Sequence, residues 1–438
     1  MNITSTPNCS MHGVVNCPGD KSISQRVLMI ASLINDQMKI RGFLHANDPL
    51  CTLSSLNQIG ANIEIDKNGI IRIKKRNKPF LKSKKPLDLG NSGTGLRLML
   101  GMTSGLGLEL SFQGDKSLSS RPMGRVIKPL IKMGVNMESL NEMLPIKIFP
   151  SKLKRSFIYE LPIASAQVKS CILLAGLASG NSVTVIEPIQ SRDHTERMLK
   201  NFGVKLEINS IDGKNVIHLN EGSSLHAKDY QVVGDISSAS FLIVGALISK
   251  SKKLKILDVG MNPTRTGILK VLDQMGANID ITNLRVESGE PLADIVVHES
   301  QLKGVELRGS IIPNIIDEIP IISIAAAFAE GETIIRDASE LRVKESDRLR
   351  AISAGFNKLG VEYENFDDGI KIYGNPASLV LSNPISIDSY DDHRIAMSFL
   401  IAGLKCNKPI TVTKCMNIFT SFPNFIELTS SLGYQIEK

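Results

Sequence analysis

The stretch Pro18-Gly19-Asp20-Lys21-Ser22-Ile23-Ser24-Gln25-Arg26 leads directly into the apolar run Val27-Leu28-Met29-Ile30-Ala31. A glycine and an aspartate before an apolar run predict a turn, a helix N-cap and a buried helix. Lys21, Ser22 and Arg26 then lie on the first turns of this helix, with Ser22 and Arg26 at i, i+4. Backbone N–H groups at such a terminus, joined by lysine and arginine, form an anion site. A capped helix with solvated charges explains this one stretch equally well, so the interpretation depends on repetition.

The chain repeats a helix that ends in a glycine and turns into a short strand. This pattern is typical of a left-handed glycine that follows the last helical residue. It recurs at intervals of 69 to 84 residues, with the glycines at Gly60, Gly134, Gly203, Gly276, Gly360 and Gly433. The spacing predicts six copies of one structural unit of about 70–80 residues.

A second series of sequence features runs in phase with the glycines. Polar clusters precede helices rich in small and apolar residues, at Ser22, Ser92, Ser165, Ser237, Asp317 and Asp391. Helices that are apolar nearly all round, such as the one that contains Ile321 to Phe328, are typical of the centre of a domain. Each unit is therefore predicted to contain a buried helix with a polar N-terminus, a second helix and strands.

At 438 residues the chain is too long for one ordinary core, so we expect two domains. Three units per domain, with helices inside and sheets outside, give an α/β fold of the inverse α/β barrel or inside-out prism kind. A break near Gly234-Asp235 predicts one domain formed by 1–18 plus 235–438 and an inserted domain of 19–234. If the buried helices of each domain run alike and the domains face each other, their polar N-termini meet at one cleft, suited to a multiply charged anion.

The net charge of +7 is concentrated in one segment. Arg72 to Lys85 contains eight basic residues and no acid, and without these eight charges the net charge falls from +7 to −1. We interpret this run as a solvated loop. Aromatic residues are sparse there, so a platform that stacks nucleic-acid bases is not expected.

The six cysteines show neither a C-x-x-C pair nor a histidine at ligand spacing. Cys171 lies inside an apolar run and is predicted to be a core residue. This pattern favours a reduced, cytoplasmic chain without a zinc site. We find no signal peptide, transit peptide or membrane span, and expect no metal, no cofactor and a monomer.

Several polar stretches of the first half are candidates for ligand binding. The glycines of Leu89 to Arg97 permit close backbone approach, and Asn91 adds a donor beside Gly93. Arg121 lies in a constrained loop before a proline. The stretch Ser191 to Glu196 offers Arg192 as a functional candidate, whereas His194, between two acids, fits a structural role. Ser165-Ala166-Gln167 opens another apolar helix.

The second half contains most of the candidate acid–base groups. Asp317 and Glu318 precede a strongly apolar helix, where desolvation favours general-base chemistry. Lys344 and Arg348 are expected to share a helix face at i, i+4, although a solvated charged face is the ordinary explanation of such a run. His393 and Arg394 begin another apolar helix and are expected to lie at the cleft.

Together these motifs resemble the signatures of the enolpyruvyl transferase family that acts on shikimate 3-phosphate. The resemblance rests on Pro18 to Arg26, Leu89 to Thr94, Ser165 to Gln167, Arg342 to Leu349 and Asp391 to Arg394, in order along the whole chain. It implies two inverse α/β domains that close over their substrates. It also implies transfer of the enolpyruvyl group of phosphoenolpyruvate to the 5-hydroxyl of shikimate 3-phosphate, with release of phosphate and without a cofactor.

The resemblance also implies roles for individual residues. The expected ligands of shikimate 3-phosphate are Ser22, Arg26, Ser165, Ala166 through its backbone, Arg192, Asp317 and Lys344. The expected ligands of phosphoenolpyruvate are Lys21, Gly93, Arg121, Gln167, Arg348 and Arg394. In the implied mechanism Asp317 removes the hydroxyl proton, Glu345 protonates the methylene carbon, and Lys21 and His393 assist proton handling and phosphate departure. Gly93, retained where an alanine would intrude, leaves room for the inhibitor glyphosate.

Two alternative functions stay open at this point. A sister transferase that acts on a UDP-amino sugar shares the fold, but it uses a cysteine five residues before the loop arginine, where this chain has Lys116. A nucleic-acid-binding relative of the same repeat fold is prompted by the basic run, and its expected stacking aromatics are lacking there.

Overall fold

The six glycines predicted to end helices all have a left-handed backbone. Their φ angles are 95° at Gly60, 110° at Gly134, 89° at Gly203, 84° at Gly276, 72° at Gly360 and 93° at Gly433. Residues with a Cβ rarely adopt this region, so glycine is required there. The periodicity that predicted six units is confirmed. The computed structural model describes residues 1–249 and 253–438.

Each of the six repeats forms a four-stranded sheet with a buried helix beside it. In the third repeat, β10 (Ser156–Glu160) is followed by the buried helix α6 (Ala166–Ser179) and by the parallel strand β11 (Ser182–Glu187). The antiparallel hairpin of β12 (Leu206–Ile211) and β13 (Lys214–Leu219) completes the sheet in the order β10-β11-β13-β12. The described residues contain six such sheets.

The repeats are divided between two compact parts of the chain, which we call unit 1 and unit 2. Unit 2 comprises Gly19–Val232 and Glu287–Glu290. Its first sheet contains β3 (Met38–Arg41), β4 (Ile63–Ile65), β5 (Ile71–Ile73) and β14 (Tyr230–Gln231), with helices α1 (Lys21–Leu33) and α2 (Asn47–Gln58). Its second contains β6 (Leu87–Asp88), β7 (Leu110–Gln113), β8 (Asn136–Leu140) and β9 (Met143–Phe149), with α3 (Gly93–Gly105), α4 (Lys116–Ser119) and α5 (Gly124–Met133). Its third sheet is the one formed by β10 to β13, and helix α7 (His194–Asn201) lies in the sequence between β11 and β12.

Unit 1 comprises Met1–Pro18, Val233–Val286 and Pro291–Lys438. One sheet contains β2 (Gly13–Asn16), β15 (Leu254–Gly260), β16 (Ile279–Glu287) and β17 (Glu290–Val297), with α8 (Ile236–Ile248) and α9 (Gly267–Gln274). The next contains β18 (Glu306–Leu307), β19 (Gly331–Ile335), β20 (Glu362–Phe366) and β21 (Gly369–Gly374), with α10 (Ile312–Ile315), α11 (Ile319–Ala327) and α12 (Arg348–Leu359). The last contains β1 (Ile3–Ser5), β22 (Ile385–Asp388), β23 (Ile410–Thr413) and β24 (Ile436–Glu437), with α13 (His393–Ala402) and α14 (Phe425–Ser431). Short 3-10 helices lie at Gly309–Ile311, Ser339–Val343, Gly403–Lys405 and Cys415–Thr420.

Strand exchange explains why unit 1 is discontinuous. Strand β2, which precedes α1 in the sequence, pairs in parallel with β15 of unit 1. Conversely β14, which precedes α8, pairs in parallel with β3 of unit 2. The chain therefore passes from one unit to the other after residue 18 and after residue 232. The sequence analysis placed the second of these boundaries two residues later, at 234–235. The turn 287–290 of the β16–β17 hairpin packs with unit 2, a contact that sequence periodicity does not reveal.

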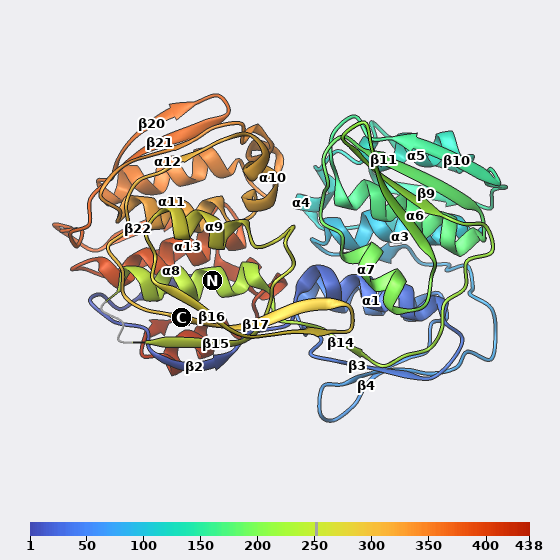
Figure 1. Ribbon diagram of the computed structural model, residues 1–438, viewed down its shortest axis with the longest axis horizontal. Coiled ribbons are helices and arrows are strands. Elements are labelled where there is room, and N and C mark those ends of the chain that lie inside the picture. Colours follow the sequence, from blue (N-terminus) through green and yellow to red (C-terminus); the bar gives the residue numbers. More distant parts are fainter. Residues whose placement is uncertain (250–252) are drawn as a thin grey trace. The chain divides into compact units, whose positions relative to one another are not determined.

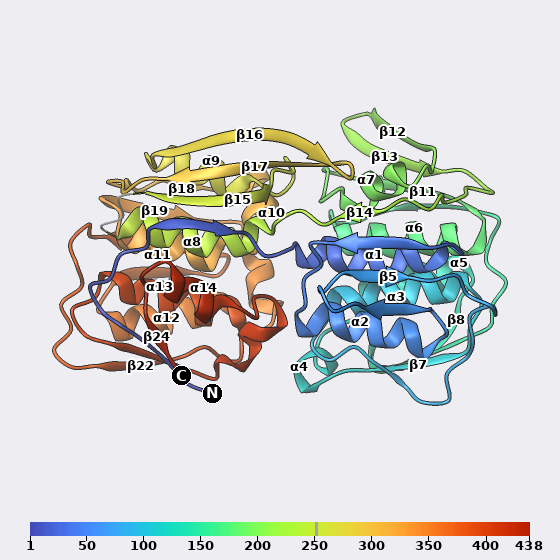
Figure 2. The same ribbon diagram turned by 90° about the horizontal axis from the view of Figure 1, so that it is seen from below.

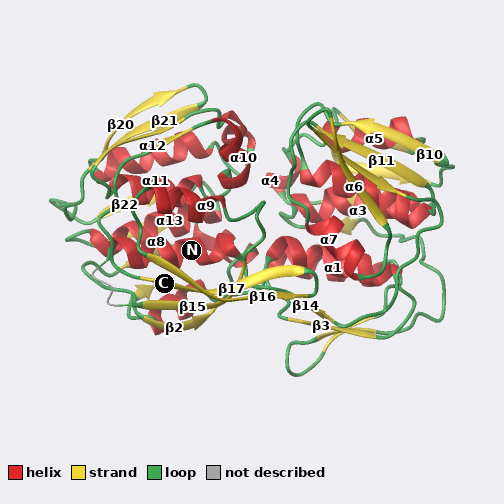
Figure 3. Ribbon diagram, in the orientation of Figure 1, coloured by secondary structure: helices red, strands yellow, loops and turns green. Residues whose placement is uncertain are grey.

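Within each unit the helices lie inside and the sheets outside, as predicted. Figures 2 and 3 show the long helices of either unit enclosed by strands. In Figure 1, α3 and α6 of unit 2 lie side by side beneath β10 and β11. Every residue of α8 and of α11 is buried, because these helices are apolar nearly all round and contact neighbours on all sides.

Among the described residues, no single helix combines the length and the apolar character needed to cross a membrane. Gly309–Ile315 and Ile319–Ala327 meet that test only when taken together, by length and composition, and a bend of 107° separates them.

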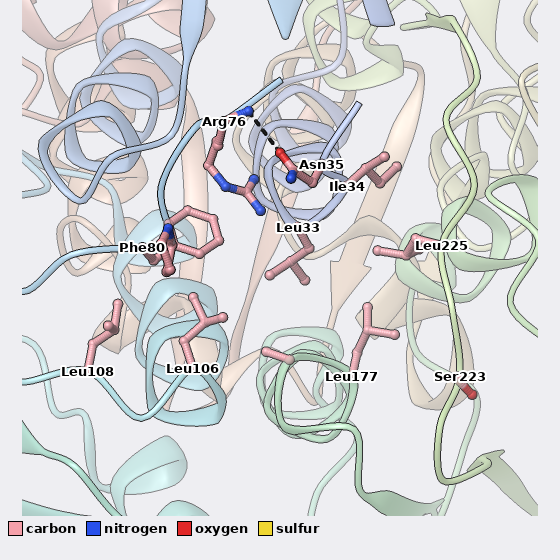
Figure 4. Close-up of a pocket in the computed structure, with 12 residues that line it drawn as sticks. Leu33, Ile34, Asn35, Arg76, Phe80, Leu106, Leu108, Leu177, Ser223 and Leu225 are labelled. Carbon is pink, nitrogen blue, oxygen red and sulfur yellow. Dashed lines mark hydrogen bonds between the residues drawn. The ribbon is translucent and has the colours of Figure 1, made fainter. Parts of the chain in front are cut away.

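The basic segment Arg72 to Lys85 is a solvated loop only in part. Arg72 lies in β5 and its guanidinium is 2.7 Å from the carboxylate of Asp66. Arg76, shown in Figure 4, is half-buried, and its Nη1 donates to the carbonyl oxygen of Ser32 at the end of α1. The lysines of the segment are exposed, so the prediction is correct for them and wrong for the two arginines.

Candidate functional site

The N-terminus of α1 carries the first group of predicted ligands. Asp20 caps the helix, because its Oδ1 accepts from the Ile23 N–H at 2.8 Å. The Nζ of Lys21 lies 3.0 Å from the Asp48 carboxylate. Arg26 is buried and donates to the Ser22 carbonyl oxygen at 3.1 Å, one helical turn back. The predicted shared face of Ser22 and Arg26 is confirmed.

Helix α3 brings Gly93 close to two guanidinium groups. A Cβ at Gly93 would stand 3.2 Å from Arg97 Nη1 and 3.3 Å from Arg121 Nη1. Arg121 donates from Nη2 to Asn91 Oδ1 at 2.7 Å, and the Asn91 amide donates to Asp115 at 2.7 Å. The glycine therefore makes the space in which these positive charges gather, since any side chain would displace them.

The N-termini of α1, α3 and α6 meet through side-chain hydrogen bonds. Gln25 on the first turns of α1 donates to Ser92, the N-cap of α3. Gln167 at the start of α6 donates to Thr94 Oγ1 at 2.9 Å and accepts from Arg97 Nη1 at 2.5 Å. The three helices of unit 2 therefore point their N-termini at one place, as predicted, and combine their partial positive charges there.

A buried ion cluster supports the segment that carries Arg192. Lys169 on α6 places its Nζ 2.9 Å from Glu187 and 2.6 Å from Glu196, and all three side chains are at most 2% exposed. Glu187 also accepts hydrogen bonds from the backbone N–H and the hydroxyl of Ser191. The cluster therefore fixes the backbone beside Arg192, which is half-buried between β11 and α7. We refer to Lys169, Glu187 and Glu196 as the lysine cluster.

Other predicted residues of this unit lie close by. Ser165 caps α6 by accepting from the Val168 N–H at 3.5 Å, and Ala166 is the first helical residue. His194 is buried and its Nδ1 is 2.7 Å from Glu290 Oε1, a contact that packs the turn 287–290 on α7. The geometry gives His194 a structural environment, in line with the expectation from sequence.

In unit 1 the carboxylate of Asp317 faces two cations. Its Oδ1 is 3.4 Å from Arg348 Nη1 and 3.7 Å from Lys344 Nζ. Its carbonyl oxygen accepts from Arg394 Nη1 at 2.8 Å. The described contacts of this carboxylate are ionic, so two cations lie beside the group that the sequence analysis proposed as a general base.

Arg348 joins three carboxylates in one buried fork. Besides Asp317 it donates to Glu345 at 2.6 Å and to Asp392 at 2.8 Å, and its side chain is 1% exposed. Burial lowers the pKa of Arg348, but the carboxylates of Asp392, Glu345 and Asp317 raise it by more, so the pKa lies above its ordinary value. The guanidinium thus holds the predicted base on its Nη1 and the predicted acid on its Nη2.

The relation of Lys344 and Arg348 differs from the prediction. Helix α12 begins at Arg348, and Lys344 lies in the turn before it, so they do not share a helix face. Asp347 caps the helix and directs the chain so that both cations reach Asp317. A solvated charged face is excluded for Arg348 by its burial.

Side chains from the N-termini of α8, α11 and α13 contact one another next to Asp317. Arg394, the second residue of α13, lies 3.5 Å from Glu318 Oε1, and Glu318 accepts from the Ser237 hydroxyl at the start of α8. Ser237 in turn accepts from buried Arg265 at 2.7 Å. His393 is buried at the first position of α13. Unit 1 therefore repeats the convergence seen in unit 2.

The turn before α13 is strained. Tyr390 and Asp391 have φ angles of 55° and 56°, which non-glycine residues seldom adopt. Asp392 then caps α13 by accepting from the Arg394 N–H at 2.9 Å while it binds Arg348 through its other oxygen. Backbone strain of this kind collects at functional sites.

Sequence reasoning missed several residues of these clusters. Arg97 follows Gly93 by four positions, so the i, i+4 rule could have placed it beside the glycine. Lys169 is a charge within an apolar helix, a signal of a buried pair. Asp48, the partner of Lys21, comes from another element, and no local pattern identifies it.

The clusters offer cations, hydrogen-bond donors and carboxylates, which suit anion binding and proton transfer. Within residues 1–249 and 253–438, no group of three or more His, Cys, Asp or Glu side chains is arranged to hold a metal ion.

Comparison with known proteins shows similarity over the whole chain. The family model of EPSP synthase (3-phosphoshikimate 1-carboxyvinyltransferase) matches residues 6–428. The 3-phosphoshikimate 1-carboxyvinyltransferase of Vesicomyosocius okutanii is 47% identical over 431 residues, which cover 98% of this chain and 97% of the relative. That of Coxiella burnetii is 41% identical over 439 residues, with 100% and 98% covered. A solved EPSP synthase from Acinetobacter baumannii is 40% identical, with 100% of this chain and 99% of that chain covered and a TM-score of 0.87.

Proposed function

The chain belongs to the EPSP synthase (3-phosphoshikimate 1-carboxyvinyltransferase) family, and we propose that the side chains at the helix N-termini of its two units carry out this family's reaction. That reaction transfers the enolpyruvyl group of phosphoenolpyruvate to the 5-hydroxyl of shikimate 3-phosphate and releases phosphate. Both substrates carry phosphate and carboxylate groups. Forked guanidinium donors and helix N-termini match such groups, which accounts for the number of arginines in the clusters.

Substrate recognition is divided among the residues already located. Shikimate 3-phosphate is held by Ser22, Arg26, Ser165, the backbone of Ala166, Arg192, Asp317 and Lys344. Phosphoenolpyruvate is held by Lys21, Asn91, Gly93, Arg121, Gln167, Arg348 and Arg394. The described contacts support this division in one respect: the side chains of Asn91 and Arg121 are hydrogen-bonded to each other, and both lie beside Gly93.

The reaction proceeds by addition and elimination. Asp317 accepts the proton of the 5-hydroxyl, and the oxygen attacks the central carbon of phosphoenolpyruvate. The methylene carbon takes up a proton from Glu345, giving a tetrahedral adduct. Loss of a proton from the new methyl group and departure of phosphate then restore the double bond. Lys21 and His393 assist the leaving phosphate.

The observation that carries this assignment is the shared guanidinium of Arg348. It lies 3.4 Å from Asp317 and 2.6 Å from Glu345, so it holds both carboxyl groups in fixed orientation. A base and an acid held by one planar group suit a reaction that removes one proton and delivers another.

The test is phosphate release from phosphoenolpyruvate, measured with and without shikimate 3-phosphate. We expect the wild type to release phosphate only when both are present. Asp317→Asn keeps the size of the side chain but removes the base, and should lower kcat about 10²–10⁴-fold. The matched control is Asp367→Asn, an exposed aspartate of the same unit, which should not change kcat. An Asp317→Asn variant with wild-type kcat would overturn the assignment.

We further infer that the protein works as a monomer in the cytoplasm. All six cysteines are free thiols, as suits a reducing compartment. Sedimentation at the mass of a dimer would refute the first part, and recovery of the native chain from a compartment other than the cytoplasm the second.

A further inference from the structure

A chain of hydrogen bonds in unit 1 begins at Arg265 and ends at Arg394. Arg265 lies in the loop 261–266 before α9, and its side chain is 3% exposed. Its Nη2 donates to the Ser237 hydroxyl at 2.7 Å. Ser237 donates to Glu318 Oε1, which lies 3.5 Å from Arg394 Nη1. A residue that the sequence analysis did not identify is therefore connected to a predicted ligand of phosphoenolpyruvate.

The loop that carries Arg265 is held in place by Asn262. The Oδ1 of Asn262 accepts from the Thr264 N–H at 2.9 Å and from the Thr264 hydroxyl at 2.7 Å. The Asn262 carbonyl oxygen accepts from the Arg265 N–H at 2.8 Å, and all three side chains are buried. Arg265 also lies 3.2 Å from the carboxylate of Asp235, the N-cap of α8. The guanidinium therefore has a fixed backbone and a fixed ion-pair partner.

The chemistry of Arg265 sets the direction of this hydrogen-bond chain. A guanidinium only donates, so the Ser237 hydroxyl must be the acceptor in their contact. The single hydroxyl proton of Ser237 is then directed at Glu318. Because a hydroxyl group otherwise rotates to suit its surroundings, Arg265 holds it in the orientation that reaches this carboxylate.

Glu318 depends on the Ser237 proton because its carboxylate is fully buried. The side chain is 0% exposed, and Oε2 has no hydrogen-bond partner within the described residues. Oε1 accepts from Ser237 and from Arg394. A buried carboxylate with few donors is costly. Loss of the Ser237 proton should therefore turn the Glu318 carboxylate toward Arg394 and draw the guanidinium out of its position.

Arg394 uses only one of its terminal nitrogens for contacts with the protein. Nη1 donates to the Asp317 carbonyl oxygen at 2.8 Å and lies 3.5 Å from Glu318 Oε1. Nε and Nη2 make no hydrogen bond to any residue that the structure describes, and the side chain is 11% exposed. This Nε–Nη2 edge suits a carboxylate or phosphate, which accepts two parallel hydrogen bonds. The contacts at Nη1 set the direction in which that edge points.

We propose that Arg265 is a positioning residue: through Ser237 and Glu318 it orients the guanidinium that receives phosphoenolpyruvate. The inference rests on the proposed function, because Arg394 is a ligand of phosphoenolpyruvate only under that proposal. Arg265 itself is not a catalytic residue, since it acts through the other members of the chain.

Ser237→Ala interrupts the chain with little change in volume, and Asp235 still caps α8. We expect the KM for phosphoenolpyruvate to rise about tenfold, the effect of one charge-assisted hydrogen bond. The KM for shikimate 3-phosphate should change less than about twofold, since most of its proposed ligands belong to unit 2. The matched control is Ser240→Ala, which removes a buried hydroxyl of the same helix and should leave both KM values within about twofold.

Arg265→Lys tests whether Arg265 acts through Ser237. Lysine keeps a positive charge beside Asp235, so the fold should be retained, but it lacks the planar fork that directs Nη2 at Ser237. Alone it should raise the KM for phosphoenolpyruvate. In the Ser237→Ala background it should add less than about twofold, because the link is already interrupted. An unchanged KM in Arg265→Lys, or full multiplication of the two effects, would overturn the proposal.

Crystal structures distinguish this proposal from the proposed function. In Ser237→Ala and in Arg265→Lys the Arg394 guanidinium should leave the Asp317 carbonyl oxygen, and in Ser240→Ala it should stay. An unmoved Arg394 in the first two variants would overturn the proposal. A displaced Arg394 with an unchanged KM for phosphoenolpyruvate would uphold its positioning by Arg265 and refute its assignment to this substrate. A wild type that releases no phosphate would refute the proposed function, and the position of Arg394 would then decide the proposal alone.

Discussion

Replacement of Lys169 by methionine tests whether the lysine cluster is an essential support of unit 2. Methionine keeps an unbranched apolar side chain of similar length but removes the ammonium group. Glu187 and Glu196 then lose a partner at 2.9 Å and 2.6 Å in a place that is at most 2% exposed. Two like charges would remain buried without a cation, which is among the most costly arrangements in a protein.

The expected loss can be estimated from these contacts. Removal of one partner from a buried ion pair costs about 3–5 kcal/mol. In a domain of 150–250 residues each kcal/mol lowers Tm by about 2–4 °C, so Tm should fall by about 6–20 °C. Because Glu187 also holds the backbone of Ser191, displacement of this carboxylate should move Arg192 and raise the KM for shikimate 3-phosphate more than that for phosphoenolpyruvate.

The chain offers a matched control for this substitution. Lys214 lies 2.6 Å from Glu160, the same distance as Lys169 from Glu196, but both partners are about half exposed. Lys214→Met should therefore cost no more than about 1 kcal/mol. Stability is measured by urea unfolding followed by circular dichroism. Equal losses in the two variants would refute the argument that burial gives the lysine cluster its importance.

The same cluster predicts a dependence of stability on pH. Burial raises the pKa of Glu196, and the opposing effect of Lys169 is smaller. The folded chain therefore holds this proton more tightly than the unfolded chain, whose glutamate titrates near pKa ~4.3. The stabilisation is complete below that value and is lost as pH rises through the higher folded pKa. Relative to wild type, Glu196→Gln should become more stable as pH rises through this window, and a constant difference would contradict the assignment.

Two further substitutions test the substrate clusters. Gly93→Ala forces Arg97 or Arg121 to move by a few tenths of an ångström, so the KM for phosphoenolpyruvate and the inhibition constant of glyphosate should rise together by on the order of tenfold in steady-state assays; an unchanged KM would show that the guanidinium groups do not bind this substrate. Arg348→Met leaves three carboxylates without their shared cation and should cost about 3–5 kcal/mol in urea unfolding. Arg350→Met, an exposed neighbour on the same helix, should cost little, and a similar loss in both would contradict the role of burial.

The repeat architecture could be predicted from sequence because its determinants are local. A glycine with positive φ is required wherever a helix turns sharply into a strand, so Gly60, Gly134 and their counterparts record the period of the fold in the chain itself. The apolar surface of α11 likewise reports burial on all sides. These features are properties of single segments.

The exchange of β2 and β14 between the units could not be predicted in this way. Each is a strand of at most four residues, and its partner lies more than 180 residues away in the sequence, as for Tyr230 with Ile40. Nothing in such a short strand specifies which edge it joins. The contact of His194 with Glu290 is of the same kind, because it joins two residues of unit 2 that are 96 positions apart in the sequence.

The candidate site shows the same division between local and non-local information. Lys21, Arg26 and Arg394 could be located because each lies in the first two turns of an apolar helix, where a cation is otherwise unfavourable next to the helix dipole. Their partners could not, since Asp48 and Glu318 come from different elements. The prediction for Lys344 and Arg348 was wrong for the related reason that the helix begins four residues later than the charge spacing suggests.

The carboxylates that pair with these cations explain how so many positive charges can gather in each unit. Lys21 is paired with Asp48 at 3.0 Å, Arg348 with Glu345 at 2.6 Å and Arg394 with Glu318 at 3.5 Å. Without these carboxylates the positive charges would repel one another at helix termini that are already positive. Under the proposed function, an incoming phosphate or carboxylate competes with these protein carboxylates. We therefore expect substrate affinity to depend on the difference between two sets of ion pairs, and so on the carboxylates as well as on the cations.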